Sequence, residues 1–400
     1  MKKVLIIFAL SMAIAIFIGV HQQRNAELSR MVGQMILVGF RGATPDALPV
    51  QELANDIRAG RVGGVILFSS DVARGREMDL SWDEIRSANK VRNIVNVNQV
   101  KALNEYLQDA ARDSNRPPLF ISIDQEGGRV VRLTLDHDFD FIMPNARTQA
   151  ADYTTEQVER MHYILSTRLR ALGFNLNFAP VVDIDINPDS PAIGRLGRAF
   201  SSDPMTVVAY ARAAMTGMER AGMIWSLKHF PGHGSARGDT HFETVDITNV
   251  WSDVELVPYR ELLVPTPTGP GLRIAQNGMV MIAHVFNRNI DDRFPASMSY
   301  RTIEGLLRRG MNFDGVVISD DLQMGAIYQN FGLRETLKHA ILAGNDIMLL
   351  GNNMTYTPNL GRAAHAEIMD LVRAGEIPRM RIVQSYNRIM KLKSRVESRR

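Results

Sequence analysis

Short runs of apolar and often β-branched residues recur eight times along the chain. Each run is five to eight residues long and mostly apolar, which is typical of strands buried on both faces. The segments between the runs carry apolar residues at helical spacing instead. The eight predicted strands are Met35–Phe40, Gly64–Phe68, Leu119–Asp124, Asn175–Val182, Ile224–His229, Met279–His284, Gly315–Asp320 and Asn345–Leu350.

Helix boundary signals mark several of the intervening segments. Thr154–Leu172 opens with Thr-Thr-Glu-Gln, which is a helix start signal, and is followed by Gly173, a frequent helix stop. Pro204–Ala221 is followed by Gly222 in the same way. We predict further helices over Val100–Arg112, Leu333–Leu342 and Thr357–Ala374.

The regular alternation of strands and helices predicts an α/β fold, namely a single (β/α)8 TIM barrel over residues 25–400. The alternative is a doubly wound open sheet, which normally uses fewer strands and carries a glycine-rich phosphate turn after its first strand. The turn after the first predicted strand, Phe40-Arg41-Gly42-Ala43, lacks that glycine pattern. The pattern therefore favours the barrel.

The N-terminal segment has the order of a secretory signal. Lys2 and Lys3 precede the apolar run Val4–Val20, and a polar stretch follows it. The run of 17 residues is also long enough, at the short limit, for a membrane anchor. We expect residues 1–24 to be a signal peptide or an anchor. The protein would then be exported to the periplasm or the cell surface, attached to the inner membrane if the segment is not cleaved.

Two further segments are expected to lie at the surface. The tail at 379–400 carries eight basic residues and one acidic residue, with apolar residues at Ile382, Ile389 and Leu392. Its pattern predicts a closing barrel helix with a solvated basic end. Pro265–Gly271, rich in proline and glycine, is expected to form a surface loop.

Composition narrows the class of protein. With 45% hydrophobic and 22% charged side chains among 400 residues, the chain has the make-up of a soluble enzyme rather than of a disordered or fibrous protein. A net charge of +3 gives little support to nucleic-acid binding. The sequence contains no cysteine, which excludes disulfides, cysteine-ligated zinc, iron–sulfur clusters and thiol nucleophiles.

Polar residues cluster where the predicted strands end. In a barrel the carboxyl ends of all strands lie on one rim, and that rim carries the chemistry. We therefore expect these groups to form a polar pocket. They are Asp124–Arg129, Asp183 and Asp185, Lys228-His229, His284, and Asp320-Asp321.

The loop after Lys228-His229 contains a histidine with a nearby carboxylate. His241 follows Asp239 by two residues, beyond a bend that Pro231 and neighbouring glycines enforce. A carboxylate so close can accept a hydrogen bond from the imidazole and prepare it for proton transfer near neutral pH. On spacing alone, a loop histidine that is simply held by its neighbour explains the pair at least as well.

Asp320 ends an apolar strand, where a carboxylate is costly unless it is solvated, paired or used. Its uses there are as a nucleophile, a base or a metal ligand. The neighbouring Asp321 would face another way, and we expect it to cap the following helix.

Six separated blocks of the sequence form one ordered set of motifs. They are Ile123–Arg132, Leu176–Asp183, Gly197–Phe200, Lys228–Gly234 with Asp239-Thr240-His241, Ala283–Val285 and Ile318–Met324. Together they resemble the motifs of the β-N-acetylhexosaminidase branch of glycoside hydrolase family 3. The resemblance extends from about Leu28 to about Leu392, which is nearly the whole chain beyond the N-terminal segment.

The resemblance implies a single (β/α)8 barrel that needs no metal and no organic cofactor. It implies Asp320 as the nucleophile and His241 as the general acid/base, paired with Asp239, in retaining hydrolysis through a covalent glycosyl-aspartate. The implied substrate is a terminal N-acetylglucosamine on peptidoglycan fragments or related glycans, and we expect a monomer. The residues implied to hold the terminal sugar are Asp124, Arg132, Arg198, Lys228 and His229.

Three alternatives stay open at this point. A metal-dependent barrel hydrolase would use His229, His233, His241 and His284 as ligands, although the first predicted strand lacks the usual His-x-His pair. An N-acetylglucosaminide phosphorylase would suit a histidine acid, which tolerates incoming phosphate better than a carboxylate does. A non-enzymatic wall-binding protein would keep the fold without the chemistry.

Overall fold

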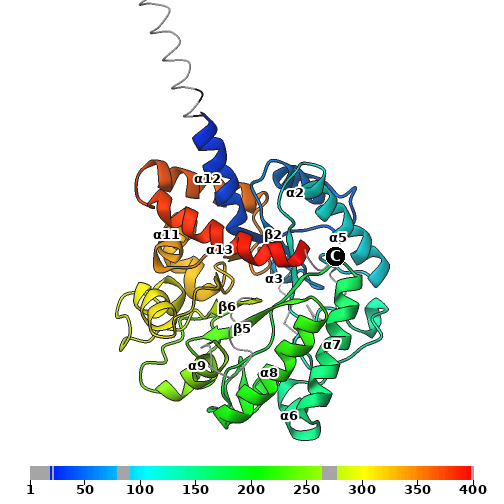
Figure 1. The fold of residues 1–400 in the computed structure, drawn as a ribbon, viewed down its shortest axis with the longest axis vertical. Helices are drawn as coiled ribbons and strands as arrows, with labels where there is room; N and C mark the ends of the chain where they lie inside the picture. The colour runs from blue at the N-terminus through cyan, green and yellow to red at the C-terminus, as the bar shows by residue number, and fades with distance from the viewer. Residues whose placement is uncertain (1–18, 20–21, 79–90, 264–276, 398–400) are drawn as a thin grey trace, which may run out of the picture.

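The computed structural model describes Gly19 and residues 22–78, 91–263 and 277–397. Eight parallel strands lie in the order β7-β6-β5-β4-β3-β2-β1-β8, and an isolated bridge between Ile318 and Ile347 brings β7 back to the start of β8. Helices surround this ring of strands (Figure 1). The predicted (β/α)8 barrel is therefore confirmed, and the open doubly wound sheet is wrong. The strands are β1 (Ile36–Gly39), β2 (Gly64–Ile66), β3 (Phe120–Ile123), β4 (Leu176–Asn177), β5 (Ile224–Phe230), β6 (Gly278–Ile282), β7 (Val316–Ser319) and β8 (Met348–Leu350).

The strands lie where the apolar runs predict them, but β4 is much shorter than expected. It contains only two residues, whereas the apolar pattern predicts a strand over Asn175–Val182. Pro180 has no N–H group to donate to a neighbouring strand, so regular pairing stops before it. Pairing with β5 resumes in a single bridge between Val181 and Lys228.

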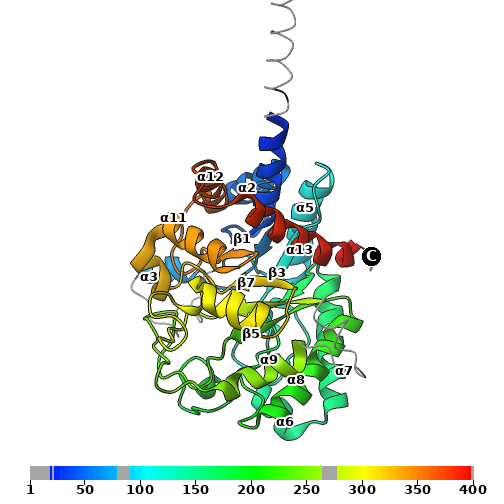
Figure 2. The same ribbon diagram turned by 60° about the vertical axis from the view of Figure 1, so that its left-hand side comes forward.

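The helices form the outer layer of the barrel, as Figure 2 shows from a second side. The predicted start signal at Thr154 is a capping box, in which Thr154 and Gln157 each accept a hydrogen bond from the other's backbone N–H. The two expected stops, Gly173 and Gly222, have φ angles of 90° and 73°, which favour glycine. The helices are α2 (Leu48–Arg58), α3 (Val72–Glu77), α5 (Val97–Arg112), α6 (Ala146–Asp152), α7 (Thr155–Ala171), α8 (Pro204–Arg220), α9 (Val257–Leu263), the π-helical η5 (Arg301–Arg309), α11 (Gly325–Ala343), α12 (Leu360–Arg373) and α13 (Arg379–Glu397).

Helix α11 begins earlier than the sequence pattern indicates. The pattern predicts a helix over Leu333–Leu342, whereas α11 starts at Gly325 and is broken at Gly332, where φ is 67° and ψ is 173°. That conformation lies outside the helical region and is readily adopted only by glycine. The break separates a short helix beside the end of β7 from the longer helix that the pattern predicts.

The C-terminal helix α13 packs under the amino end of the barrel. Its three expected apolar positions are buried, as predicted. The expectation of a solvated basic end is wrong for Lys393, which is 1% exposed. Its Nζ donates to Gln34 Oε1 and to the carbonyl of Gly63, both at 2.7 Å. Since these acceptors lie just before β1 and β2, this cation fastens α13 to the strand starts.

Asp346 ties α13 to the start of β8. Its buried carboxylate accepts hydrogen bonds from Arg308 at 2.7 Å, Ser385 at 2.8 Å and Arg381 at 3.2 Å. Burial would raise the pKa of Asp346, but the charges of Arg308, Arg381 and Arg388 lower it. Because this pKa is lowered on folding, the carboxylate contributes stability above the pKa of an unfolded aspartate and loses it as the pH falls.

Asp346→Ala is expected to lower the free energy of unfolding by about 3–5 kcal/mol, because it leaves buried guanidinium groups without a counter-charge. Urea-induced unfolding, followed by circular dichroism, would measure the loss. The exposed Asp370, which pairs with Arg373 on the surface of α12, provides the control. Asp370→Ala should cost less than about 1 kcal/mol, and equal losses in the two variants would contradict the role given to Asp346.

The chain before the barrel is only partly described. Residues 22–34 form a helix whose Leu28 and Val32 are buried in the core. The signal or anchor expected over residues 1–24 lies outside the described residues, apart from Gly19 and residues 22–24, as does the loop expected at 265–271. Among the helices of the described ranges, none combines the length and the apolar character needed to cross a bilayer.

Candidate active site

Three residues that the resemblance places around a sugar meet at the carboxyl rim of the barrel. Asp124 directly follows β3, and Lys228 lies near the end of β5. Lys228 Nζ is 3.0 Å from Asp124 Oδ1, and Arg132 Nη2 is 3.2 Å from Asp124 Oδ2. A cation on each oxygen orients the carboxylate, which can also accept hydrogen bonds from ligand hydroxyls.

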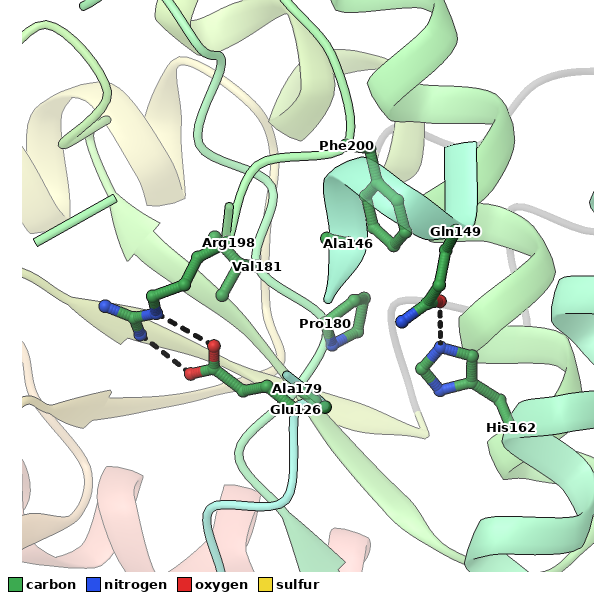
Figure 3. A pocket seen from close by; sticks show the side chains of 10 residues that line it. Glu126, Ala146, Gln149, His162, Ala179, Pro180, Val181, Arg198 and Phe200 are labelled. Atoms are coloured by element: carbon green, nitrogen blue, oxygen red, sulfur yellow. Dashed lines mark hydrogen bonds and ion pairs between the residues drawn. The ribbon is translucent and has the colours of Figure 1, made fainter. Parts of the chain in front are cut away.

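Arg198 and Glu126 form a two-pronged ion pair on the same rim, as Figure 3 shows. Arg198 Nε and Nη2 lie 2.8 and 2.7 Å from the two Glu126 oxygens, and Lys228 Nζ lies 2.6 Å from Glu126 Oε1. Burial would raise the pKa of Glu126, but the charges of Arg198 and Lys228 hold it far below its usual range. Lys228 therefore bridges two carboxylates, and Glu126 fixes two cations in place.

His229, beside Lys228 in β5, has both ring nitrogens engaged. Nδ1 is 2.6 Å from Asp183 Oδ2, and Nε2 is 3.2 Å from Arg198 Nη2. A carboxylate only accepts and a guanidinium only donates, so Nδ1 carries the proton and Nε2 accepts. The peptide bond between Lys228 and His229 is cis, and both side chains reach the same rim.

A small cavity lies behind the ion pair of Arg198 and Glu126 (Figure 3). Phe200, Gln149 and His162 form part of its other walls. His162 donates from Nε2 to Gln149 Oε1 at 3.1 Å, and burial lowers the pKa of His162 to about 4. The imidazole is therefore neutral at neutral pH. The charged residues that line the cavity are Arg198 and Glu126.

Asp320 directly follows β7, and its Oδ1 accepts a hydrogen bond of 2.8 Å from the backbone N–H of Asp321. Burial would raise the pKa of Asp320, but the attraction to His284, His229 and His241 when these rings are protonated, and the hydrogen bond from Asp321, lower it. Asp320 is therefore ionised at neutral pH, which is the state that a carboxylate nucleophile needs.

The loop that carries His241 folds back towards the strand end of Asp320. The His241 carbonyl accepts a hydrogen bond of 3.3 Å from the backbone N–H of Gly325, the first residue of α11. Within the loop, His241 Nδ1 lies 2.7 Å from Asp239 Oδ1, so the structure brings together the pair that the spacing suggests. The His241 side chain is 46% exposed, and its Nε2 can exchange a proton with a bound ligand or water.

Asp239 makes His241 more basic through a hydrogen bond and its charge. Burial would lower the pKa of His241, but the hydrogen bond and the charge of Asp239, together with the charge of Asp320, raise it. The pKa of Asp239 is lowered to about 2, because the hydrogen bond and charge of His241 outweigh the effect of burial. Near neutral pH the imidazole can therefore give up a proton and take one back while Asp239 stays ionised.

Three acids at the site received no individual role in the sequence reasoning. Glu126 and Asp183 follow strand ends and belong to the polar groups expected at the rim, but their partners could not be named from the sequence. Glu255, in the 3-10 helix η3 (Asp253–Leu256), accepts hydrogen bonds from the Gly234 backbone at 3.0 Å and the Ser235 hydroxyl at 2.5 Å. It holds the bent loop that leads to His241, but it lies 20 residues beyond Ser235 and no local pattern marks it.

Asp321 does not cap helix α11, contrary to expectation, because the residue at the cap is Met324. Its Oδ1 instead accepts hydrogen bonds from the backbone of Gln323 at 3.0 Å and of Gly351 at 2.8 Å. Burial raises the pKa of Asp321 to about 6. Since Gly351 directly follows β8, the Asp321 carboxylate joins the carboxyl ends of β7 and β8.

The histidines named for the metal-dependent alternative are used separately. His284 contacts Ser297 and the Asp321 carbonyl, whereas His241 pairs with Asp239. Within the part of the chain that the structure describes, no three histidine, aspartate or glutamate side chains are arranged to hold a metal ion. His284 and His241 are therefore engaged by different partners.

Comparison with known proteins places this chain in a family. The family model described as the glycosyl hydrolase family 3 N-terminal domain matches residues 27–392. The chain is 38% identical over 285 residues to the beta-hexosaminidase LpqI of Mycobacterium tuberculosis, covering 69% of this chain and 68% of that relative. It is 36% identical over 305 residues to the beta-hexosaminidase of Tolumonas auensis, covering 74% and 78%.

Solved structures agree with the family match. A glycoside hydrolase family 3 beta-N-acetylglucosaminidase from Paenibacillus sp. matches with a TM-score of 0.77 and 31% identity over 93% of this chain. The chain spans 63% of the length of that enzyme. The structure of Mycobacterium tuberculosis LpqI matches with a TM-score of 0.72 and 31% identity, covering 91% of this chain and 93% of LpqI. The chain therefore belongs to glycosyl hydrolase family 3 and is a glycosidase.

Proposed function

We propose that the protein is a retaining β-N-acetylhexosaminidase that releases terminal N-acetylglucosamine. The observation that carries the proposal is that a carboxylate and a basic imidazole lie on the same rim of the barrel. An ionised carboxylate on Asp320 lies close to a loop whose His241 is made more basic by Asp239. The names of the relatives, beta-hexosaminidase and beta-N-acetylglucosaminidase, support the choice of sugar.

The terminal sugar is held by the charged groups around Asp124. The Asp124 carboxylate accepts hydrogen bonds from two neighbouring sugar hydroxyls, while Lys228, Arg132 and Arg198 donate to the remaining oxygens. Because each of these three cations contacts Asp124 or Glu126, the site binds a neutral sugar without leaving one of them unpaired. His229 contributes to the same wall through its contact with Arg198.

In the first step, an oxygen of Asp320 attacks the anomeric carbon and the bond from that carbon to the leaving oxygen breaks. His241 donates its Nε2 proton to the leaving oxygen, which departs as an alcohol. In the second step, His241 takes a proton from water, the water oxygen attacks the anomeric carbon, and the bond to Asp320 breaks. Two inversions restore the β configuration and both residues return to their starting states.

The natural substrate and the location of the protein are further parts of the proposal. We favour peptidoglycan fragments as the source of the sugar, acted on by an exported monomer in the periplasm or at the cell surface. In residues 1–24, two lysines precede an apolar run, and a polar stretch follows it. This order supports export, and the protein would stay anchored in the membrane if the segment is not cleaved. Phosphorolysis is the alternative reaction, in which phosphate replaces water in the second step.

The deciding experiment is intact-mass and peptide mass spectrometry after incubation with a slow fluorosugar analogue of N-acetylglucosamine. We expect one added sugar on the peptide that contains Asp320, because a fluorine at the sugar ring slows both steps and lets the covalent ester accumulate. Absence of the adduct, or an adduct on another carboxylate, would contradict the proposal. Product analysis with phosphate present should show free sugar; sugar phosphate would instead identify a phosphorylase.

Asp239→Ala should lower kcat by about 10²-fold and move the alkaline limb of the kcat/KM profile to lower pH. The pKa of His241 is raised by Asp239, so its loss lowers that pKa, and the general acid is then deprotonated at a lower pH. Initial rates on an aryl N-acetylglucosaminide across pH would measure the shift. A reduced rate with an unmoved alkaline limb would contradict the pairing of Asp239 with His241 as the source of that limb.

A further inference from the structure

His284 and Ser297 form a buried pair next to the strand end that carries Asp320. His284 lies just beyond β6, and both side chains are 0% exposed. His284 Nε2 is 2.9 Å from the Asp321 carbonyl oxygen, and His284 Nδ1 is 2.7 Å from Ser297 Oγ. The proposed reaction uses neither of these two residues.

The hydrogen bonds of His284 determine its chemical state. A carbonyl oxygen only accepts, so Nε2 carries a proton and donates it to Asp321. In a neutral ring Nδ1 then accepts from the Ser297 hydroxyl. Burial favours this neutral ring because it lowers the pKa of His284. A donor without charge suits this place, since an imidazolium so close to Asp320 would weaken that carboxylate as a nucleophile.

Asp321 is held from three directions. Its carbonyl accepts from His284, its carboxylate accepts from the backbone of Gln323 and Gly351, and its own N–H donates to Asp320 Oδ1. The contact with Gly351 is close: a Cβ atom there would lie 2.3 Å from Asp321 Oδ2, so that position requires glycine. Any shift of Asp321 would carry the carboxylate of Asp320 with it.

We propose that His284, Ser297 and Asp321 form a clamp that positions the Asp320 carboxylate for attack on the anomeric carbon, an inference that rests on the proposed function. The clamp holds Oδ1 through the Asp321 N–H and thereby orients Oδ2 towards the sugar. His284, Ser297 and Asp321 are positioning residues, because they act on Asp320 and not on the substrate. The clamp matters because a displacement of about 1 Å at a reacting atom can cost about 10²-fold in rate.

His284→Leu tests the clamp by removing the donor to Asp321. We expect kcat on an aryl N-acetylglucosaminide to fall by about 10²-fold. The inhibition constant of the product N-acetylglucosamine should be unchanged, because the groups around Asp124 are untouched. His284→Gln keeps an N–H donor of similar reach and should recover most of the lost kcat. A Gln variant that is folded but no faster than the Leu variant would overturn the clamp.

His365 provides a matched control for the loss of a buried histidine. It is also buried, and its Nε2 also donates to a backbone carbonyl, that of Ser29, at 2.9 Å. That contact joins α12 to the helix of residues 22–34, away from the strand ends. His365→Leu should lower the melting temperature and leave kcat unchanged. An equal loss of kcat in the folded His284→Leu and His365→Leu variants would overturn the clamp.

Two further measurements keep the result decisive. If His284→Leu does not fold, Ser297→Ala, which removes only a hydroxyl, should still lower kcat severalfold, and an unchanged kcat would overturn the clamp. The rate of fluorosugar labelling separates the two proposals. A label acquired equally fast by the unmodified and His284→Leu proteins overturns the clamp alone. A label that the unmodified protein never acquires contradicts the proposed function itself.

Discussion

Asp320→Ala is expected to abolish turnover of an aryl N-acetylglucosaminide, with kcat reduced by at least about 10⁴-fold, while the protein stays folded. The loss is large because alanine removes the attacking oxygen, and the adjacent carboxylate of Asp321 is already engaged. The neighbouring Asp321 is held by the backbone of Gln323 and Gly351. Initial-rate kinetics, with circular dichroism and melting temperature as checks on folding, would measure the effect.

Asp314 provides the control on the same strand. It precedes β7, at the opposite end of the strand from Asp320. Its side chain is 77% exposed and forms an ion pair with Arg388. Asp314→Ala should therefore leave kcat unchanged. Addition of azide to the Asp320→Ala protein should restore turnover of an activated substrate and give the α-glycosyl azide, because the small anion attacks from the side that Asp320 occupied. A β-azide, or normal turnover without azide, would contradict the nucleophile assignment.

His241→Gln should produce the second large effect, a fall in kcat/KM of about 10³-fold for substrates with a poorly acidic leaving group. Such a leaving oxygen needs a proton as its bond to the anomeric carbon breaks. A strongly acidic aryl leaving group needs none, so its kcat/KM should fall much less. A series of aryl N-acetylglucosaminides that differ in the pKa of the phenol would measure the dependence.

The distinguishing result is the slope of rate against leaving-group pKa, which should steepen in His241→Gln. An equal loss across the series would contradict a role for His241 as the general acid. His339 serves as the control, because it pairs with Glu335 on α11, with its Nε2 at 3.3 Å from a carboxylate oxygen, outside the site. His339→Gln should leave both the rates and the slope unchanged.

Local patterns were sufficient for several helix boundaries and for one contact of the site. The capping box at Thr154 and the stops at Gly173 and Gly222 depend on residues within one helical turn. The contact of His241 with Asp239 depends on two residues in one loop. Such features are set by the chain's own neighbours, and the sequence predicts them without knowledge of the rest of the molecule.

Local patterns failed where a distant residue competes for a side chain. Asp321 has the spacing of a helix cap, but the backbone N–H of Gly351, which arrives from the end of β8, draws its carboxylate away. Lys393 is charged and was expected at the surface, but its Nζ donates to the buried Gln34 Oε1, just before β1. In each case the hydrogen bond is made with a residue at least 30 positions away.

The sequence by itself determined the eight strand–helix units, the placement of acids and histidines at strand ends, and the resemblance to glycoside hydrolase family 3. Only the tertiary structure decided which of those groups meet. Lys228 bridges Asp124 and Glu126, and Arg198 reaches Glu126 from 72 residues away. These pairings arise when the ring of strands closes and brings all carboxyl ends to one rim. A hydrogen bond requires a donor–acceptor distance that is correct to a few tenths of an ångström. The periodicity of apolar residues along the chain does not contain that information.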